Sequence, residues 1–227
     1  MVQPTTLLLT RPRAVSEMFA KQVQDTVGPL QVLIASLIEI ELLKIHAAPD
    51  AQTIVFTSRN GVLAWECAEL PTEARCYCVG QATADAARAL GFEPYVSGGT
   101  VEHLANDLKN AALMGEVLHV HGEHTRGDLV ERLNANGLNV RGLIAYKQHL
   151  LELSENAQNL LLGGAPVIVP LFSPRTAAQF AKTGPYGSQV DVIAISNSAA
   201  QACPGAHVAP SPNVDGMITA IKAVLSA

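Results

Sequence analysis

Short apolar segments alternate with amphipathic segments along the whole chain. The short segments are rich in Val, Leu and Ile, whereas the segments between them repeat apolar residues at helical spacing. Strands that are apolar on both faces and alternate with helices indicate parallel sheets in α/β layers. We predict strands at 6–10, 32–35, 53–57, 74–79, 93–96, 116–120, 139–143, 167–172, 191–195 and 207–209. We predict helices at 14–27, 60–67, 82–90, 101–112, 126–136, 154–162, 176–183, 198–203 and 214–225.

The chain contains an internal repeat. Residues 54–84 and 169–200 both read as strand, Ser-containing turn, helix, strand, small polar turn and the start of a helix. The spacing is nearly the same, since Ser58 to Gly80 spans 22 positions and Ser173 to Ser196 spans 23. A repeat of this length predicts two similar α/β domains.

Two further segments, 37–42 and 142–149, look extended and lie between the two repeated regions. We interpret them as a pair of connecting strands, so that the chain crosses between the domains twice. The first domain is then discontinuous, 1–36 plus 150–227, and the second is an insertion, 37–149. Two crossings predict a hinge-like motion of the domains around a cleft.

Composition narrows the class of protein. Hydrophobic residues make up 48% of the 227 residues and charged residues 15%, which is typical of a well-buried globular protein. The net charge of −5 and the lack of a basic stripe argue against a nucleic-acid partner. We see no secretory leader and no apolar stretch of membrane-spanning length, so we expect a soluble cytoplasmic protein without membrane association. Nothing demands more than a monomer.

Cysteine and histidine do not form a metal motif. Cys67, Cys76, Cys78 and Cys203 include no CxxC pair, and we interpret them as reduced core cysteines. His119 and His121 would point the same way from a strand, but no Cys or carboxylate cluster completes a site, so packing or surface histidines are favoured over metal ligands. The glycine-rich nucleotide fingerprints and the GxSxG elbow are absent. We expect no metal.

Six turns that follow predicted strands carry small or hydroxylic residues, often with an arginine. In an open α/β sheet, ligands bind at the carboxyl ends of the strands, where helix N-termini favour carboxylates or phosphates. Each hydroxyl has a simpler interpretation as a helix N-cap. Their number favours an anion-binding cleft, whose candidate residues are Thr10, Arg11, Ser58, Arg59, Gly80, Thr83, Gly122, Arg126, Ser173, Ser196 and Ser198.

Several segments in order resemble uroporphyrinogen-III synthases. They are Leu-Leu-Leu-Thr-Arg-Pro at 7–12, Val-Phe-Thr-Ser-Arg-Asn-Gly-Val at 55–62, Val-Gly-Gln-Ala-Thr-Ala at 79–84, His-Gly-x3-Arg at 121–126, Ala-Tyr at 145–146, Phe-Ser-Pro at 172–174 and Ala-Pro-Ser-Pro at 209–212. Each motif is weak alone, but their order and spacing are specific. The resemblance implies two flavodoxin-like three-layer domains with a two-stranded connector.

The resemblance also implies an activity. Such a lyase closes hydroxymethylbilane, a substrate with eight carboxylates, to uroporphyrinogen III, with the terminal pyrrole inverted and water lost. The reaction belongs to the tetrapyrrole pathway to haem, sirohaem, cobalamin and chlorophyll. No cofactor is required, and hydroxymethylbilane synthase is the expected upstream donor. Tyr146 is the catalytic candidate for helping the hydroxyl depart, the alternative being a packing role; Thr83 is a substrate contact or a cap.

This sequence departs from the family pattern at two places. Ala199 stands where a threonine is usual, although Ser198 could substitute, and Ser36 stands where a proline is common. Two other functions stay open on the residues alone. One is a two-lobed protein that binds an anionic small molecule without catalysis, and the other is a nucleotide-dependent transferase, against which the missing glycine fingerprint counts.

Overall fold

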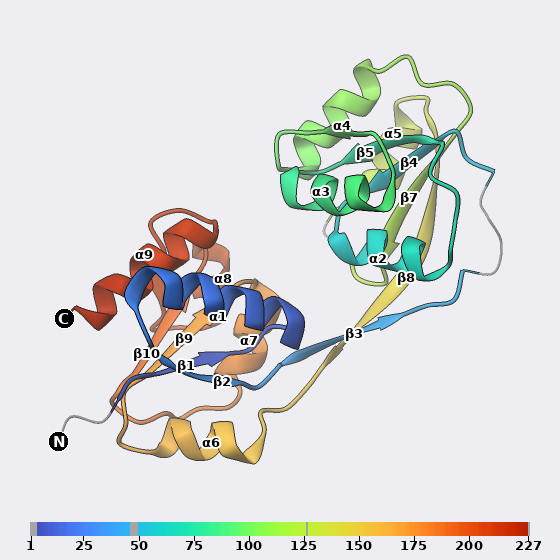
Figure 1. Ribbon diagram of the computed structural model, residues 1–227. Coiled ribbons are helices and arrows are strands. Elements are labelled where there is room, and N and C mark those ends of the chain that lie inside the picture. The colour runs from blue at the N-terminus through green and yellow to red at the C-terminus, as the bar shows by residue number, and fades with distance from the viewer. Residues whose placement is uncertain (1–3, 46–49, 126, 227) are drawn as a thin grey trace. The chain divides into compact units, whose positions relative to one another are not determined.

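The computed structural model describes residues 4–45, 50–125 and 127–226, and its chain divides into two compact units. The split unit comprises 1–39 and 149–227, and the inserted unit comprises 40–148. Each is an α/β unit with a mostly parallel sheet, which confirms the predicted fold class (Figure 1). Among the described residues, no helix is long and apolar enough to cross a membrane.

The split unit has a parallel sheet of strand order β11-β10-β9-β1-β2 between two helical layers. Its strands are β1 Thr6–Leu9, β2 Gln31–Ile34, β9 Val167–Leu171, β10 Val190–Ala194 and β11 His207–Val208. Its helices are α1 Arg13–Val27, α6 Glu155–Leu162, α7 Pro174–Ala181, α8 Asn197–Ala202 and α9 Val214–Leu225. Side chains of α1 and α9 form one core cluster with the sheet, and those of α6, α7 and α8 form another, because the central strands are apolar on both faces.

The inserted unit is built in the same way, with strand order β3-β8-β7-β4-β5-β6. Its strands are β3 Ile38–Leu42, β4 Thr53–Phe56, β5 Arg75–Cys78, β6 Pro94–Val96, β7 Glu116–Gly122 and β8 Asn139–Leu150. Its helices are α2 Arg59–Cys67, α3 Gln81–Leu90, α4 Val101–Asn110 and α5 Leu129–Ala135. Helices α2 and α3 share a core cluster that includes Trp65, while α4 and α5 pack on the other face against Val55 and Val117.

The chain passes from one unit to the other in β3 and again in β8. Backbone hydrogen bonds from Leu43 N to Ala145 O and from Leu151 N to Leu37 O, both 2.9 Å, show that these two strands run antiparallel. The sequence predicted separate strands at 139–143 and 142–149, but the structure has one strand of 12 residues, β8. Gly142 does not interrupt it, because the backbone there stays paired with His119 of β7.

Two further sequence predictions need correction. Helix α5 begins at Leu129 rather than at 126, because Gly127 has a φ of +84° and Asp128 occupies the N-cap. Cys76 and Cys78 are buried on one face, with their Sγ atoms 3.9 Å apart, but Cys67 is exposed at the end of α2 and is not a core cysteine. All four cysteines are reduced.

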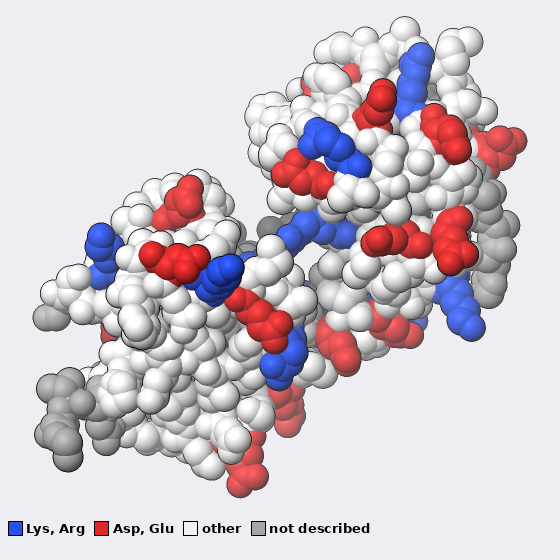
Figure 2. Space-filling model, in the orientation of Figure 1, with Lys and Arg blue, Asp and Glu red and all other residues white. Residues whose placement is uncertain are grey.

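Charged side chains of both signs are interspersed over the face drawn in Figure 2. Ion pairs such as Arg132 with Glu102 at 2.7 Å and Arg88 with Asp85 at 2.8 Å lie at the surface. Pairs of this kind contribute little to stability. The fold therefore depends on the four apolar clusters that the described residues form.

We expect the Phe92→Ala substitution to lower the free energy of unfolding by about 3–5 kcal/mol, since it removes a buried ring and leaves a cavity. Phe92 is 2% exposed and contacts the rings of Phe56 and Trp65. The sequence contains one tryptophan, so fluorescence during urea unfolding reports on this cluster. Met114→Ala, at a side chain that is 82% exposed, is the control and should change the value by less than about 0.5 kcal/mol. Equal effects of the two substitutions would contradict this account of the core.

Candidate active site

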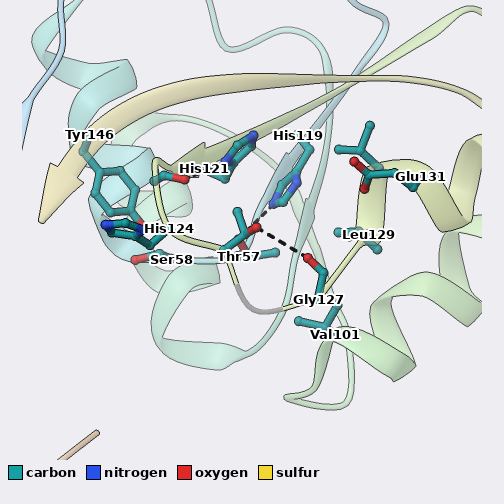
Figure 3. Close-up of a pocket in the computed structure, with 13 residues that line it drawn as sticks. Thr57, Ser58, Val101, His119, His121, His124, Gly127, Leu129, Glu131 and Tyr146 are labelled. Atoms are coloured by element: carbon teal, nitrogen blue, oxygen red, sulfur yellow. Dashed lines mark hydrogen bonds between the residues drawn. The ribbon is translucent and has the colours of Figure 1, made fainter. Parts of the chain in front are cut away.

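The inserted unit contains a cavity of about 290 Å³ beside the carboxyl ends of its central strands. Thr57 and Ser58 follow β4, while His119, His121 and Gly122 belong to β7, and Tyr146 belongs to β8 (Figure 3). The starts of α4 and α5 complete the wall. This is the edge where a parallel α/β sheet is expected to hold a ligand. The structure thus brings together three of the predicted site residues, Ser58, Gly122 and Tyr146.

Tyr146 owes its position to Gly122. The register between β7 and β8 shifts after His121, so that Gly122 pairs with Tyr146, and Glu123 N donates to Tyr146 O at 2.9 Å. A Cβ on Gly122 would lie only 2.5 Å from Cε2 of Tyr146. Glycine is therefore required for the tyrosine ring to lie here, where it is 6% exposed and lines the cavity.

His119 is a buried neutral histidine of the cavity wall. Its side chain is 4% exposed, and its Nε2 lies 3.0 Å from Oγ1 of Thr57, as Figure 3 shows. Its Nδ1 is buried and has no hydrogen-bond partner among the described residues. Burial lowers the pKa of His119 from 6.5 to about 3, with a smaller contribution from the neighbouring His121. The imidazole is thus uncharged at neutral pH.

His121 lies beside His119, and the centroids of the two rings are 4.7 Å apart. Its Nδ1 donates to the carbonyl oxygen of Gly122 at 2.7 Å, which leaves Nε2 as the other polar atom of the ring. Gly142 of β8 accommodates this ring, since a Cβ there would lie 2.7 Å from Nε2. Among the described residues, no group of three or more His, Cys, Asp or Glu could hold a metal ion.

Arg59, Gly80 and Thr83, which were also predicted as site residues of the inserted unit, lie outside the lining of this cavity. Ser58 is a lining residue and also the N-cap of α2, where its Oγ accepts from Asn60 N at 3.2 Å, and Arg59 is the first residue of that helix. Gly80 is the N-cap of α3, and a Cβ there would lie 3.3 Å from the Cα of Gly99. Thr83 lies within α3 and is 6% exposed, so it is not the cap. Arg126 lies outside the described residues.

In the split unit, the predicted turns follow the carboxyl ends of β1, β9 and β10. Thr10 is fully buried, and its Oγ1 has no hydrogen-bond partner in the described part of the chain. The guanidinium of Arg11 lies 4.3 Å from the ring centroid of Phe172. The carbonyl oxygen of Arg11 accepts from the hydroxyls of Ser16 at 2.9 Å and Ser36 at 2.8 Å. Ser36 therefore holds this turn in place of the proline that is common there.

The serines after β9 and β10 are helix caps. Ser173 Oγ accepts from Thr176 N at 3.1 Å at the start of α7, and Ser196 Oγ accepts from Ala199 N at 3.4 Å at the start of α8. Ser198 Oγ lies 3.0 Å from Ser196 Oγ. The capping interpretation therefore holds for Ser173 and Ser196, and Ser173 Oγ also lies 2.7 Å from Thr176 Oγ1. Substrate contact at these residues stays a prediction.

Sequence reasoning missed most of the cavity lining, including the polar residues Thr57, His119, His121 and His124. The available signal was the alternation of His119 and His121 along a strand, which we interpreted as packing. That interpretation accounts for the burial of His119 but not for the cavity beside it. Thr57 lies between the end of β4 and Ser58, the N-cap of α2. The N-cap pattern therefore indicates Ser58 but not Thr57.

Comparison with known proteins identifies the family. The sequence profile of the family described as uroporphyrinogen-III synthase HemD matches residues 26–219. No curated protein matches the chain in a direct search. A solved uroporphyrinogen-III synthetase from Helicobacter pylori is similar at 18% identity and a TM-score of 0.70, over 99% of this chain and 100% of that one. A mutant uroporphyrinogen III synthase from the extremely thermophilic bacterium Thermus thermophilus is similar at 16% identity and a TM-score of 0.57, over 97% and 99%.

Because the profile covers most of the sequence, the chain belongs to the uroporphyrinogen-III synthase family. The two solved structures, at such low identity, show that the fold is shared. The activity of the family is that of a cyclising lyase of tetrapyrrole biosynthesis, which closes hydroxymethylbilane to uroporphyrinogen III with loss of water.

We expect His119 to make stability depend on pH. The unfolded chain binds a proton at this histidine near pH 6.5, whereas the folded chain does so only near pH 3. The contribution of neutral His119 to the free energy of unfolding is therefore complete above pH 6.5. It is lost progressively as the pH falls towards 3, by up to about 1.4 kcal/mol per pH unit. We would measure the free energy of unfolding in urea between pH 6.5 and 4.5. Its slope against pH should be smaller by this amount in the His119→Gln variant than in the wild type. His207→Gln, at an exposed histidine, is the control substitution, and identical slopes for all three proteins would refute the assignment.

Proposed function

We propose that the cavity of the inserted unit binds part of hydroxymethylbilane and that Tyr146 acts there on the hydroxymethyl group. The observation that carries the proposal is the position of Tyr146 in the same cavity wall as Ser58 and Gly122, at the carboxyl end of a parallel sheet. Hydroxyl and imidazole groups offer the substrate hydrogen-bond donors there. The proposal extends to Arg59, Gly80, Thr83 and Arg126 of the same unit, and to Thr10, Arg11, Ser173, Ser196 and Ser198 of the split unit, as further substrate contacts.

The proposed reaction balances without an external oxidant or reductant. The C–O bond of the hydroxymethyl group breaks, and Tyr146 assists by donating a hydrogen bond or a proton to the departing hydroxyl, which leaves as water. The resulting azafulvenium is attacked by the substituted carbon of the terminal pyrrole, which gives a spiro intermediate. That intermediate fragments and recloses with the ring inverted. The α-carbon of the reclosed pyrrole then loses its proton, which restores the aromatic ring and returns the proton that the departing hydroxyl took. The pyrroles supply the electron pairs in every step.

The contribution of the protein in this proposal is mainly positioning. Hydroxymethylbilane also closes without an enzyme, but then the terminal ring keeps its orientation. The protein must therefore hold the substrate so that the inverting closure is faster than the direct one. The restricted place of the Tyr146 ring, between β8 and the bare Cα of Gly122, supports such a role for the cavity wall.

Location and assembly belong to the proposal as well. We expect a cytoplasmic monomer that receives hydroxymethylbilane from hydroxymethylbilane synthase, because a substrate that closes spontaneously must be captured soon after its release. Size-exclusion chromatography with light scattering measures the assembly. A stable dimer in solution would contradict the expected monomeric state.

The direct test is to incubate the protein with freshly made hydroxymethylbilane and to separate the product isomers by chromatography after oxidation to porphyrins. We expect the type III isomer in large excess over type I. A product that is only type I, as in a reaction without protein, would overturn the proposed function. A parallel measurement of hydroxymethylbilane binding to the protein then shows whether an inactive protein still binds the substrate without converting it.

We expect Tyr146→Phe to lower kcat by about tenfold or less, because the loss of one hydroxyl leaves the positioning of the substrate intact. Steady-state kinetics with hydroxymethylbilane measure the effect. A loss above about a thousandfold in a folded variant would show that proton donation, rather than positioning, dominates the rate.

We expect Gly122→Ala to lower kcat/KM about a hundredfold, a larger effect than that of Tyr146→Phe. The added methyl group displaces the Tyr146 ring and reshapes the cavity. Gly164→Ala is the matched control in the split unit, because a Cβ there meets nothing within 4 Å. Thermal unfolding shows whether each variant folds. If Gly122→Ala were as active as Gly164→Ala, the tyrosine ring would not need its present position.

A further inference from the structure

The cavity wall contains an unusual hydrogen-bond arrangement around His119. Nε2 of this buried imidazole has one partner, the hydroxyl of Thr57 at 3.0 Å, and Nδ1 has none among the described residues. With a pKa of about 3, the ring carries a single hydrogen at neutral pH. That hydrogen lies either on Nδ1 or on Nε2, and the two tautomers give Thr57 opposite roles.

The environment of His119 selects between the tautomers. A hydrogen on Nδ1 would be a buried N–H donor without an acceptor, and such donors are rarer in proteins than buried acceptors that lack a donor. A hydrogen on Nε2 is satisfied at once by the oxygen of Thr57. His119 therefore donates through Nε2, and Thr57 Oγ1 accepts.

This choice determines what Thr57 can offer to a ligand. One lone pair of its oxygen accepts from His119, and its own O–H hydrogen is left for another acceptor, which the described residues do not provide. The neighbouring Ser58 is in the same state, since its Oγ already accepts from Asn60 N at 3.2 Å. Both residues line the cavity. Two adjacent hydroxyls are thus arranged as donors at the end of β4.

We propose that Thr57 is a further substrate-binding residue, which donates its hydroxyl hydrogen to a carboxylate of the substrate, and that His119 is a positioning residue that fixes the direction of this bond. The inference rests on the proposed function, because the resemblance gives the substrate eight carboxylates. A carboxylate accepts without donating, so it matches the O–H hydrogen that Thr57 keeps. The acidic lining residue Glu131 lies at the opposite end of the cavity from Tyr146 in Figure 3.

Paired substitutions test the two roles. Thr57→Val keeps the shape but removes the hydroxyl, and we expect it to raise the KM for hydroxymethylbilane about ten- to hundredfold with kcat little changed. Thr57→Ser retains the donor and should stay within about threefold of wild type. His119→Gln keeps an amide N–H at about the reach of Nε2 and should restore most of the binding, whereas His119→Asn, which is too short, should resemble Thr57→Val.

The double variant separates positioning from packing. Once the Thr57 hydroxyl is absent, His119→Asn should raise KM no further, because the bond that it directs no longer exists. Additive effects in Thr57→Val/His119→Asn would overturn the positioning role. If the wild-type protein forms the type III isomer while Thr57→Val keeps the wild-type KM, this inference fails and the proposed function stands. If the wild-type protein forms no type III isomer, the proposed function fails.

The tautomer can be observed without activity. In the ¹⁵N-labelled wild-type protein, long-range ¹H–¹⁵N correlation spectra distinguish a protonated Nε2 from a protonated Nδ1, and assignment of His119 follows from its absence in His119→Gln. We expect the hydrogen on Nε2 from pH 6 to pH 8. A hydrogen on Nδ1 would reverse the polarity of the Thr57 hydroxyl and overturn the inference, whether or not the Thr57 variants fold.

Discussion

Parallel pairing of strands is the constraint on which the rest of this molecule depends. A parallel neighbour can be reached only through a crossover connection, so most strands of a unit lead into a helix at the same edge of its sheet. In the inserted unit this rule brings the ends of β4 and β7 together, although Thr57 and His119 are 62 positions apart in sequence. The cavity is a consequence of the topology, and the chemistry depends on which side chains follow the strands.

Two glycines then shape the cavity wall by lacking a side chain. Gly122 leaves room for the ring of Tyr146, and Gly142 leaves room for the ring of His121. The two rings therefore lie against backbone on β7 and β8, where neighbouring strands hold them. Rigid strands are more exact supports for a binding site than loops are. The register shift after His121 serves the same purpose, since β-bulges often redirect a side chain at a functional site.

Much of this architecture was predictable from the sequence. The central strands are apolar on both faces, a pattern that parallel sheets produce, and the positions of Ser58 and Ser173 at helix starts follow from N-cap chemistry. The continuity of β8 was not predictable, because Gly142 looks like a boundary until its pairing with His119 is known. The histidines of the cavity were not predicted as site residues for a similar reason. Whether an imidazole on a strand packs in a core or faces a cavity is decided by residues distant in sequence, here Thr57 and the start of α5.

The discontinuity of the split unit has a consequence for the order of events during synthesis. Strand β1 lies between β2 and β9, and β9 is translated only after the whole inserted unit. The inserted unit, by contrast, has all of its parallel strands once β8 leaves the ribosome. Domains generally fold as units when their residues become available. A nascent chain can therefore complete the sheet that carries Tyr146 before β9 has been translated and can pair with β1. The split unit is thus the first to be translated in part and the last to complete its sheet.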